Sequence, residues 1–288
     1  MVYVDDESYP IARWGVDHAA ARGARVRTFA HHDTAALRRA LRADAPHGRP
    51  PVVLADGFCP GCGEAAPARA YLFAVRRFGG LLVLDDTQAL GILGASPAPV
   101  QPYGRGGGGS LRWHGLRAAD VLIAGSLAKA FGAPLAALAG PRALVRRFDD
   151  GSETRVHCSP PSSAALAAAA HALDVNQLHG DALRLRLARL VRRFRCTLHG
   201  AGIATVGGGF PVQTLALPPA VDVPAVHERL LKAGVRAVLH RARGRGQPQL
   251  SFLVTAAHRA EEVDAAASAV ARVLRDVPAR PIRLRGAS

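Results

Sequence analysis

Residues 79–94 of the chain read GGLLVLDDTQALGILG, and residues 120–140 read DVLIAGSLAKAFGAPLAALAG. Each segment contains a short, continuous apolar run, Leu81–Leu84 in the first and Val121–Ala124 in the second. Apolar runs of this length that stop at polar residues are typical of strands buried on both faces of a parallel sheet. The two segments therefore predict two core strands of an α/β fold.

Chemically active residues follow both runs. Asp85 comes directly after the first run, and Ser126 and Lys129 come shortly after the second. Open α/β sheets bind their ligands at the carboxyl ends of the strands. We therefore expect an acid, a hydroxyl group and a lysine at the ligand-binding edge of the sheet.

Lys129 is set apart by composition. The chain has 37 basic residues, of which only Lys129 and Lys232 are lysines. Lysine, unlike arginine, can lose its proton in a pocket and attack a carbonyl carbon to form an imine. Lys232 lies in the helical pattern ERLLKAG and is interpreted as a surface residue, whereas Lys129 lies in the small, apolar segment LAKAFGAP. A catalytic role for Lys129 is favoured over a chance surface lysine.

The segments at residues 85–91 (DDTQALG) and 126–132 (SLAKAFG) resemble the fold-type I pyridoxal-phosphate enzymes. The most similar branch is that of the α-oxoamine synthases, such as 8-amino-7-oxononanoate synthase and 2-amino-3-ketobutyrate CoA ligase. The resemblance covers nearly the whole chain. It implies an α/β fold with a three-layer large domain and a mainly parallel sheet, incomplete at the N-terminus, over residues 1–178. A smaller C-terminal α/β domain is expected over residues 179–288.

The resemblance also implies a cofactor, pyridoxal 5'-phosphate, and roles for five residues. Asp85 matches the acid that pairs with the pyridine nitrogen, although a capping or turn acid is the alternative interpretation. Lys129 matches the lysine that attaches the cofactor and later transfers a proton. Ser126 matches a phosphate-binding hydroxyl group, and Gln88 stands where the family has a histidine that contacts the ring oxygen. Ser159 is the expected N-cap of a helix whose start binds phosphate.

Two positions depart from the family pattern. Gln88 can donate a hydrogen bond but cannot titrate. The family arginine that holds the substrate carboxylate falls at Ser251, and Gln249 is also uncharged. Arg243 or Arg245 would have to replace it, so we expect weak activity with glycine, alanine or serine.

The start of the chain is a third departure. The first expected strand, Val2–Val4, resembles one in the interior of the family's large domain. The segment with the glycine-rich turn and the ring-stacking aromatic residue or histidine is therefore expected to be absent. On this hypothesis the native protein begins upstream of Met1 or is completed by another chain, and the remaining sheet has an unprotected edge.

The implied activity is condensation of an amino acid with an acyl thioester, carried by coenzyme A or by a carrier protein, in a homodimer. An aminotransferase is the nearby alternative, and a cofactor-poor paralogue acting as a binding or scaffold protein is the other. The polar start MVYVDDESYP resembles no signal peptide, and there is no apolar run of membrane-spanning length, so a cytoplasmic protein is expected.

The formal charge of +15 raises the alternative of nucleic-acid binding. The arginines are, however, spread over amphipathic stretches such as residues 183–195, aromatic residues make up only 5% of the chain, and no recognition motif is present. Nucleic acid is therefore an unfavoured partner.

No metal site is expected. Cys59 and Cys62 form a CxxC segment without a following helix or a second ligand pair, so a redox or zinc role is not favoured. The resemblance implies that this segment is a loop near the cofactor, with a tight turn. His31 and His32 are adjacent, and adjacent side chains diverge on a regular element. Asp33 is interpreted as the N-cap of a helix.

The glycine-rich segment at residues 102–110 is not followed by the lysine of a phosphate-binding Walker A loop. It is expected to form a flexible loop at the mouth of the site.

Overall fold

The computed structural model describes residues 1–45, 50–117, 119–241 and 247–276. The chain divides into two units. The first comprises Met1–Cys59 and Ala65–Ala182, and the second comprises Pro60–Glu64 and Leu183–Ser288. The sequence placed the boundary at residue 178 and assigned residues 60–64 to the first domain.

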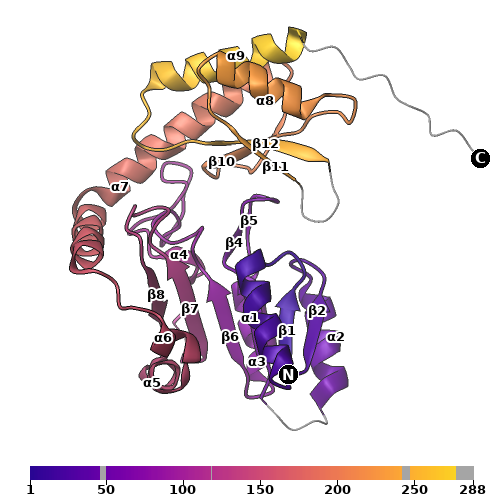
Figure 1. Ribbon diagram of the computed structural model, residues 1–288, viewed down its shortest axis with the longest axis vertical. Coiled ribbons are helices and arrows are strands. Elements are labelled where there is room, and N and C mark those ends of the chain that lie inside the picture. Colours follow the sequence, from indigo (N-terminus) through magenta and orange to yellow (C-terminus); the bar gives the residue numbers. More distant parts are fainter. Residues whose placement is uncertain (46–49, 118, 242–246, 277–288) are drawn as a thin grey trace, which may run out of the picture. The chain divides into compact units, whose positions relative to one another are not determined.

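The first unit is built on a six-stranded sheet in the order β2-β1-β3-β6-β7-β8 (Figure 1). Neighbours are parallel except for β7 and β8, which are antiparallel. The strands are β1 (Val2–Asp5), β2 (Val26–Phe29), β3 (Val52–Asp56), β6 (Leu81–Asp85), β7 (Val121–Ser126) and β8 (Ala136–Ala139). The helices are α1 (Pro10–Ala21), α2 (Thr34–Asp44), α3 (Ala68–Arg76), α4 (Gly109–Trp113), α5 (Arg142–Gly151) and α6 (Glu153–His157). A short hairpin joins β4 (Phe58–Cys59), which ends at the first cysteine, to β5 (Glu64–Ala65) through a turn that contains Cys62.

Helices α2 and α3 cover one face of this sheet and form its main core. Within β6, Leu82 and Leu84 are completely buried, whereas Leu81 and Val83 are only half-buried. The expectation that this strand is buried on both faces is therefore confirmed for one face only. At β6, the face of the sheet that carries Leu82 and Leu84 is more deeply buried than the opposite face.

The long helix α7 (Ser163–Gly200) is a single element. The predicted helix start at Ser159 is wrong. Ser162 is the residue whose hydroxyl accepts a hydrogen bond from Ala165 N, at 3.2 Å. The intervening prolines explain the shift, because proline disfavours the helical conformation in the residue before it.

The second unit contains a four-stranded antiparallel sheet in the order β11-β12-β10-β9. Its elements are β9 (Thr205–Val206), β10 (Val212–Leu215), α8 (Val223–Lys232), β11 (Val238–Arg241), β12 (Pro248–Leu253) and α9 (Ala260–Asp276). Leu230 of α8, Val270 of α9 and Leu250 of β12 are fully buried.

Across the described residues, no helix has both the length and the apolar character needed to cross a bilayer.

Candidate active site

Polar residues end three neighbouring parallel strands of the first unit. Asp56 is the last residue of β3 and Asp85 the last of β6, and the two are paired in register. Ser126 ends β7, the next strand. The structure therefore brings the predicted acid and hydroxyl to the same edge of the sheet.

Thr87 links the ends of β6 and β7. Its backbone N–H donates to Asp85 Oδ1 at 3.0 Å, and its Oγ1 accepts a hydrogen bond from Ser126 N, also at 3.0 Å. Ser126 Oγ in turn accepts one from Ala128 N at 3.2 Å, within the turn that carries Lys129. The acid and the lysine-bearing turn are thus joined by a short chain of hydrogen bonds.

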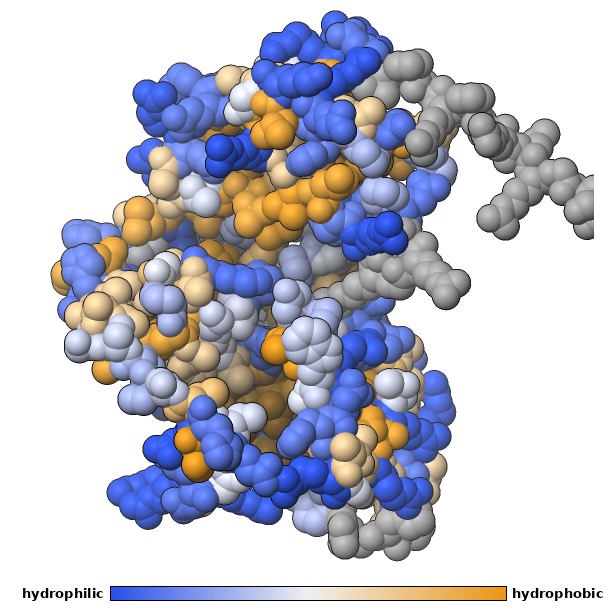
Figure 2. Space-filling model, viewed as in Figure 1, coloured by the Kyte–Doolittle hydropathy of each residue, from blue (hydrophilic) through white to orange (hydrophobic). Residues whose placement is uncertain are grey.

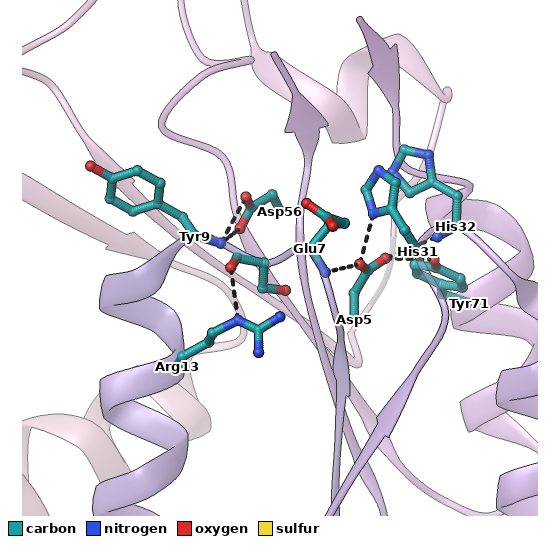
Figure 3. Close-up of polar contacts among 9 residues, drawn as sticks. Asp5, Glu7, Tyr9, Arg13, His31, His32, Asp56 and Tyr71 are labelled. Carbon is teal, nitrogen blue, oxygen red and sulfur yellow. Dashed lines mark hydrogen bonds and ion pairs between the residues drawn. The ribbon is translucent and has the colours of Figure 1, made fainter. Parts of the chain in front are cut away.

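Lys129 is exposed, and its Nζ lies 5.5 Å from the centroid of the Tyr9 ring. Tyr9 immediately precedes α1, and its backbone N–H donates to both carboxylate oxygens of Asp56, at 3.1 and 3.0 Å (Figure 3). Asp56 therefore holds the residue that carries the ring. The site consists of an amine with an aromatic ring beside it, at the edge of the sheet that also carries Asp85.

Tyr9 was missed by the sequence interpretation, which expected the ring-stacking residue to be absent. The signal available was its place: it comes shortly after a strand end and directly before a helix that begins with proline. The contact with Asp56 spans 47 residues of sequence, so no local pattern shows it.

Asp86 has a different environment from Asp85. It is 1% exposed, and its carboxylate accepts hydrogen bonds from Ser110 Oγ, at 2.5 Å, and from Ser110 N. Burial raises the pKa of Asp86, and the hydrogen bonds from Ser110 lower it by less. The backbone also packs tightly around this group, because a Cβ at Gly57 would lie 2.2 Å from Asp86 Oδ1. Asp86 is a buried anchor, whereas Asp85 is half-buried.

The glycine-rich loop makes several hydrogen bonds, and its expected flexibility stays a prediction. Gly91 N donates to Gly107 O at 2.8 Å. Gly106 is held from both sides, by Asp181 Oδ1 at 2.8 Å and by Asn176 Nδ2 at 3.1 Å. The several positive φ angles in this loop let the backbone bend back to make these contacts.

Asp5, at the end of β1, is the centre of a buried network (Figure 3). Its carboxylate accepts hydrogen bonds from His31 Nδ1 at 2.7 Å, Glu7 N at 3.0 Å, His32 N at 3.1 Å and Tyr71 OH at 3.2 Å. Burial raises the pKa of Asp5, but the hydrogen bond from His31 and the others outweigh it, so the pKa is lowered. The network fixes the loop after β2.

The histidine pair differs from the prediction in one respect. The rings of His31 and His32 are stacked with their centroids 3.7 Å apart, not divergent, because His32 has a φ of +56°. The N-cap prediction is confirmed, since Asp33 Oδ1 accepts a hydrogen bond from Ala36 N at 2.8 Å. Asp5, Asp6 and His31 lie close enough to ligate a metal ion. The four donors on Asp5 favour a structural role for this group.

Two of the predicted site residues lie apart from these contacts. Gln88 is half-buried in the turn after Asp85. Ser159 is exposed in the segment between α6 and α7, so its predicted role as the start of a phosphate-binding helix is not supported.

In the second unit, Ser251 is buried, and its Oγ lies 2.6 Å from Thr214 Oγ1 and 2.7 Å from His240 Nε2. Gln249 is half-buried in the same strand. Arg243 and Arg245 lie outside the described residues. All four cysteines lie in the described segments, and none is in a disulfide.

A mainly parallel α/β sheet with an acid, a hydroxyl and a lysine near the carboxyl ends of adjacent strands places the chain in the α/β class, whose ligands bind at this edge of the sheet. The chain belongs to the family Aminotransferase class I and II, because the model of that family matches residues 2–270. This agrees with the resemblance seen in the sequence.

Relatives and solved structures support the same placement. The chain is 30% identical over 262 residues to an 8-amino-7-oxononanoate synthase from Alkalilimnicola ehrlichii, which covers 90% of this chain and 64% of the relative. The fold of the present chain is similar to that of a Sphingomonas wittichii serine palmitoyltransferase, with a TM-score of 0.82 at 18% identity. The match covers 96% of this chain and 67% of the palmitoyltransferase chain. An 8-amino-7-oxononanoate synthase from Francisella tularensis gives a TM-score of 0.73 at 15% identity, over 95% and 75% of the two chains. The chain thus spans just under two thirds of the length of the Alkalilimnicola relative.

Proposed function

We propose that this chain binds pyridoxal 5'-phosphate and condenses an amino acid with an acyl thioester, as α-oxoamine synthases do. The observation that carries the proposal is the position of Lys129. It follows a core strand, lies beside the Tyr9 ring, and is joined through a hydrogen-bonded chain to the end of the strand that carries Asp85.

The donor set fits this cofactor. Lys129 offers an amine for the aldehyde, Asp85 a carboxylate for the pyridine nitrogen, and Tyr9 a flat ring for the aromatic face. Ser126 offers a hydroxyl for the phosphate, and Gln88 a donor for the ring oxygen. The cofactor, when bound, supplies an electron sink for a carbanion, which no side chain provides.

The protein's own residues then have separate tasks. The Asp85 carboxylate favours the protonated form of a nitrogen beside it, because an opposite charge stabilises the charged form. The exposed Nζ of Lys129 accepts and returns a proton at the reacting carbon. Tyr9 covers one side of the site against water, and Asp56 holds Tyr9 in place through its backbone.

Among the described residues, the position of the family's arginine for the substrate carboxylate holds no guanidinium group. Ser251 and its two neighbours, Thr214 and His240, present hydroxyl groups and an imidazole where the family has a guanidinium group. Arginine and carboxylate form a stronger and better oriented pair than neutral partners do. Weak activity with glycine, alanine or serine therefore remains our expectation.

We also propose a homodimer in the cytoplasm, with coenzyme A or a carrier protein as the acyl carrier. Helices α5 and α6 bury no residue within this chain, and Phe148 and Val156 are 42% and 67% exposed. Figure 2 shows such apolar side chains among the polar ones on the visible surface. A second subunit is a natural cover for the apolar side chains of these helices.

The test is an absorbance spectrum of the purified protein with and without added pyridoxal phosphate. We expect a visible band that titrates to one cofactor per chain, followed by release of free thiol when an amino acid and acyl-CoA are added. A folded protein that develops no such band would refute cofactor binding. A band without thiol release, but with transfer of the amino group to an oxo acid, would favour the aminotransferase alternative.

A further inference from the structure

Thr87 occupies the place where the hydrogen-bond ladder between β6 and β7 stops. The paired residues end at Asp85 and Ala124, and Asp86 N makes the last backbone bond, to Ala124 O at 2.7 Å. The chain turns away after Asp86, so the next inward-facing N–H of β7, that of Ser126, meets no carbonyl of β6. The Thr87 hydroxyl oxygen accepts this N–H instead, at 3.0 Å.

On its other side, β7 is held by β8. Leu127 N donates to Leu135 O at 2.9 Å, so the N–H groups of Ser126 and Leu127 point to opposite neighbours, as expected of consecutive residues in a strand. The turn that carries Lys129 therefore begins at a point fixed from both sides. On the β6 side, a side chain provides the attachment.

The same residue orients the acid. Thr87 N donates to Asp85 Oδ1 at 3.0 Å, in a local turn that any residue except proline would form. The bond to Ser126 N, in contrast, requires a hydroxyl group on the side chain. A substitution at this position thus separates the two contacts.

We propose that Thr87 is a positioning residue that sets the placement of the lysine-bearing turn relative to Asp85. The inference rests on the proposed function, because it assigns both Asp85 and Lys129 to one cofactor site. Removing the hydroxyl leaves the Ser126 N–H without its acceptor and loosens the start of the turn. Cofactor affinity should then fall, since the amine and the carboxylate must fit the same rigid ring at once.

The experiment compares three variants. Thr87→Val keeps the shape but removes the acceptor, Thr87→Ser keeps the hydroxyl, and Thr28→Val makes the same change at an exposed position in β2. Thr87→Ala is a second hydroxyl-free variant in case the valine does not fold. Two quantities are measured: amide hydrogen exchange at Ser126 in the cofactor-free protein, and the dissociation constant of pyridoxal phosphate.

Loss of one hydrogen bond of this kind corresponds to about a tenfold effect. We expect Thr87→Val to accelerate Ser126 exchange about tenfold and to weaken cofactor binding about tenfold, while Thr87→Ser and Thr28→Val stay within about twofold of the unchanged protein. Unchanged Ser126 exchange in the hydroxyl-free variants would overturn the proposal. So would a serine variant as weak as the valine variant.

The two readouts also separate this inference from the proposed function. If the unchanged protein binds no cofactor, the proposed function fails, and the positioning role falls with it even where exchange responds as expected. If the unchanged protein binds cofactor and faster exchange is not accompanied by weaker binding, only the positioning role of Thr87 is refuted.

Discussion

Replacing Ser110 with alanine should destabilise the first unit, because it removes a hydrogen bond to a buried charge. Ser110 Oγ donates to Asp86 Oδ1 at 2.5 Å, and the two residues are 0% and 1% exposed. Hydrogen bonds to charged groups contribute roughly 1.5–3 kcal/mol to stability. The Ser110 backbone N–H remains as a donor to the carboxylate, so we expect a cost of about 2 kcal/mol, or roughly a 30-fold change in the unfolding constant.

This cost should depend on pH, in a direction that the structure sets. Burial raises the pKa of Asp86, and the Ser110 hydrogen bonds oppose that shift. An acid with a raised folded-state pKa favours folding at low pH, where it is protonated in the native state, and that contribution is lost as pH rises through the folded-state pKa. The Ser110 hydroxyl stabilises mainly the ionised form, so Ser110→Ala should cost most near neutral pH and less as the pH approaches the ordinary aspartate range.

The assay is urea unfolding followed by tryptophan fluorescence. Both tryptophans, Trp14 and Trp113, lie in the first unit, and Trp113 ends the helix that contains Ser110. Ser163→Ala, at an exposed serine, is the matched control. A cost below about 0.5 kcal/mol, the usual range of surface substitutions, would refute the reasoning, as would a cost independent of pH.

Three further changes test other parts of the account. Asp85→Asn should keep the fold but reduce turnover by about 100-fold or more in steady-state assays, with the exposed Asp150→Asn as control; normal turnover would make Asp85 structural. Burial lowers the pKa of His114, although a hydrogen bond with the Ala66 backbone opposes the shift. The free energy of unfolding should therefore fall as the pH drops below the ordinary histidine range, by at most about 1.4 kcal/mol per pH unit. His114→Gln should flatten this slope between pH 7 and pH 5 in urea titrations, and an unchanged slope would show that other groups cause it. Gly109→Ala should reduce the yield of folded protein or its melting temperature, since the residue has a φ of +75° and a Cβ there would lie 1.9 Å from Asp86 Oδ2; wild-type stability would show that the loop can shift.

The parts of the fold that the sequence predicts are those set by local patterns. The apolar runs that end at Asp85 and before Ser126 predict β6 and β7, and with them the edge of the sheet that carries the candidate site. The cap at Asp33 follows from the hydrogen-bonding capacity of its side chain, and the structure shows that bond. In each case the residues that decide the structure are neighbours in sequence.

The features that the sequence does not predict depend on distant contacts or on local backbone strain. Tyr9 reaches the site because Asp56, far along the chain, holds its backbone. The glycine-rich loop contacts α7 because Gly106 makes hydrogen bonds to Asp181 and Asn176. The stacking of His31 on His32 requires a positive φ that is uncommon outside glycine.

The most direct test of the central claim is to reduce the cofactor-loaded protein with borohydride and to map the labelled peptide. The chain offers only two lysines, Lys129 and Lys232, so the label has two possible side-chain positions. The account predicts that the label is on the peptide containing Lys129, and that Lys129→Arg abolishes it. A label on Lys232, or no label in a folded and cofactor-saturated sample, would contradict the account.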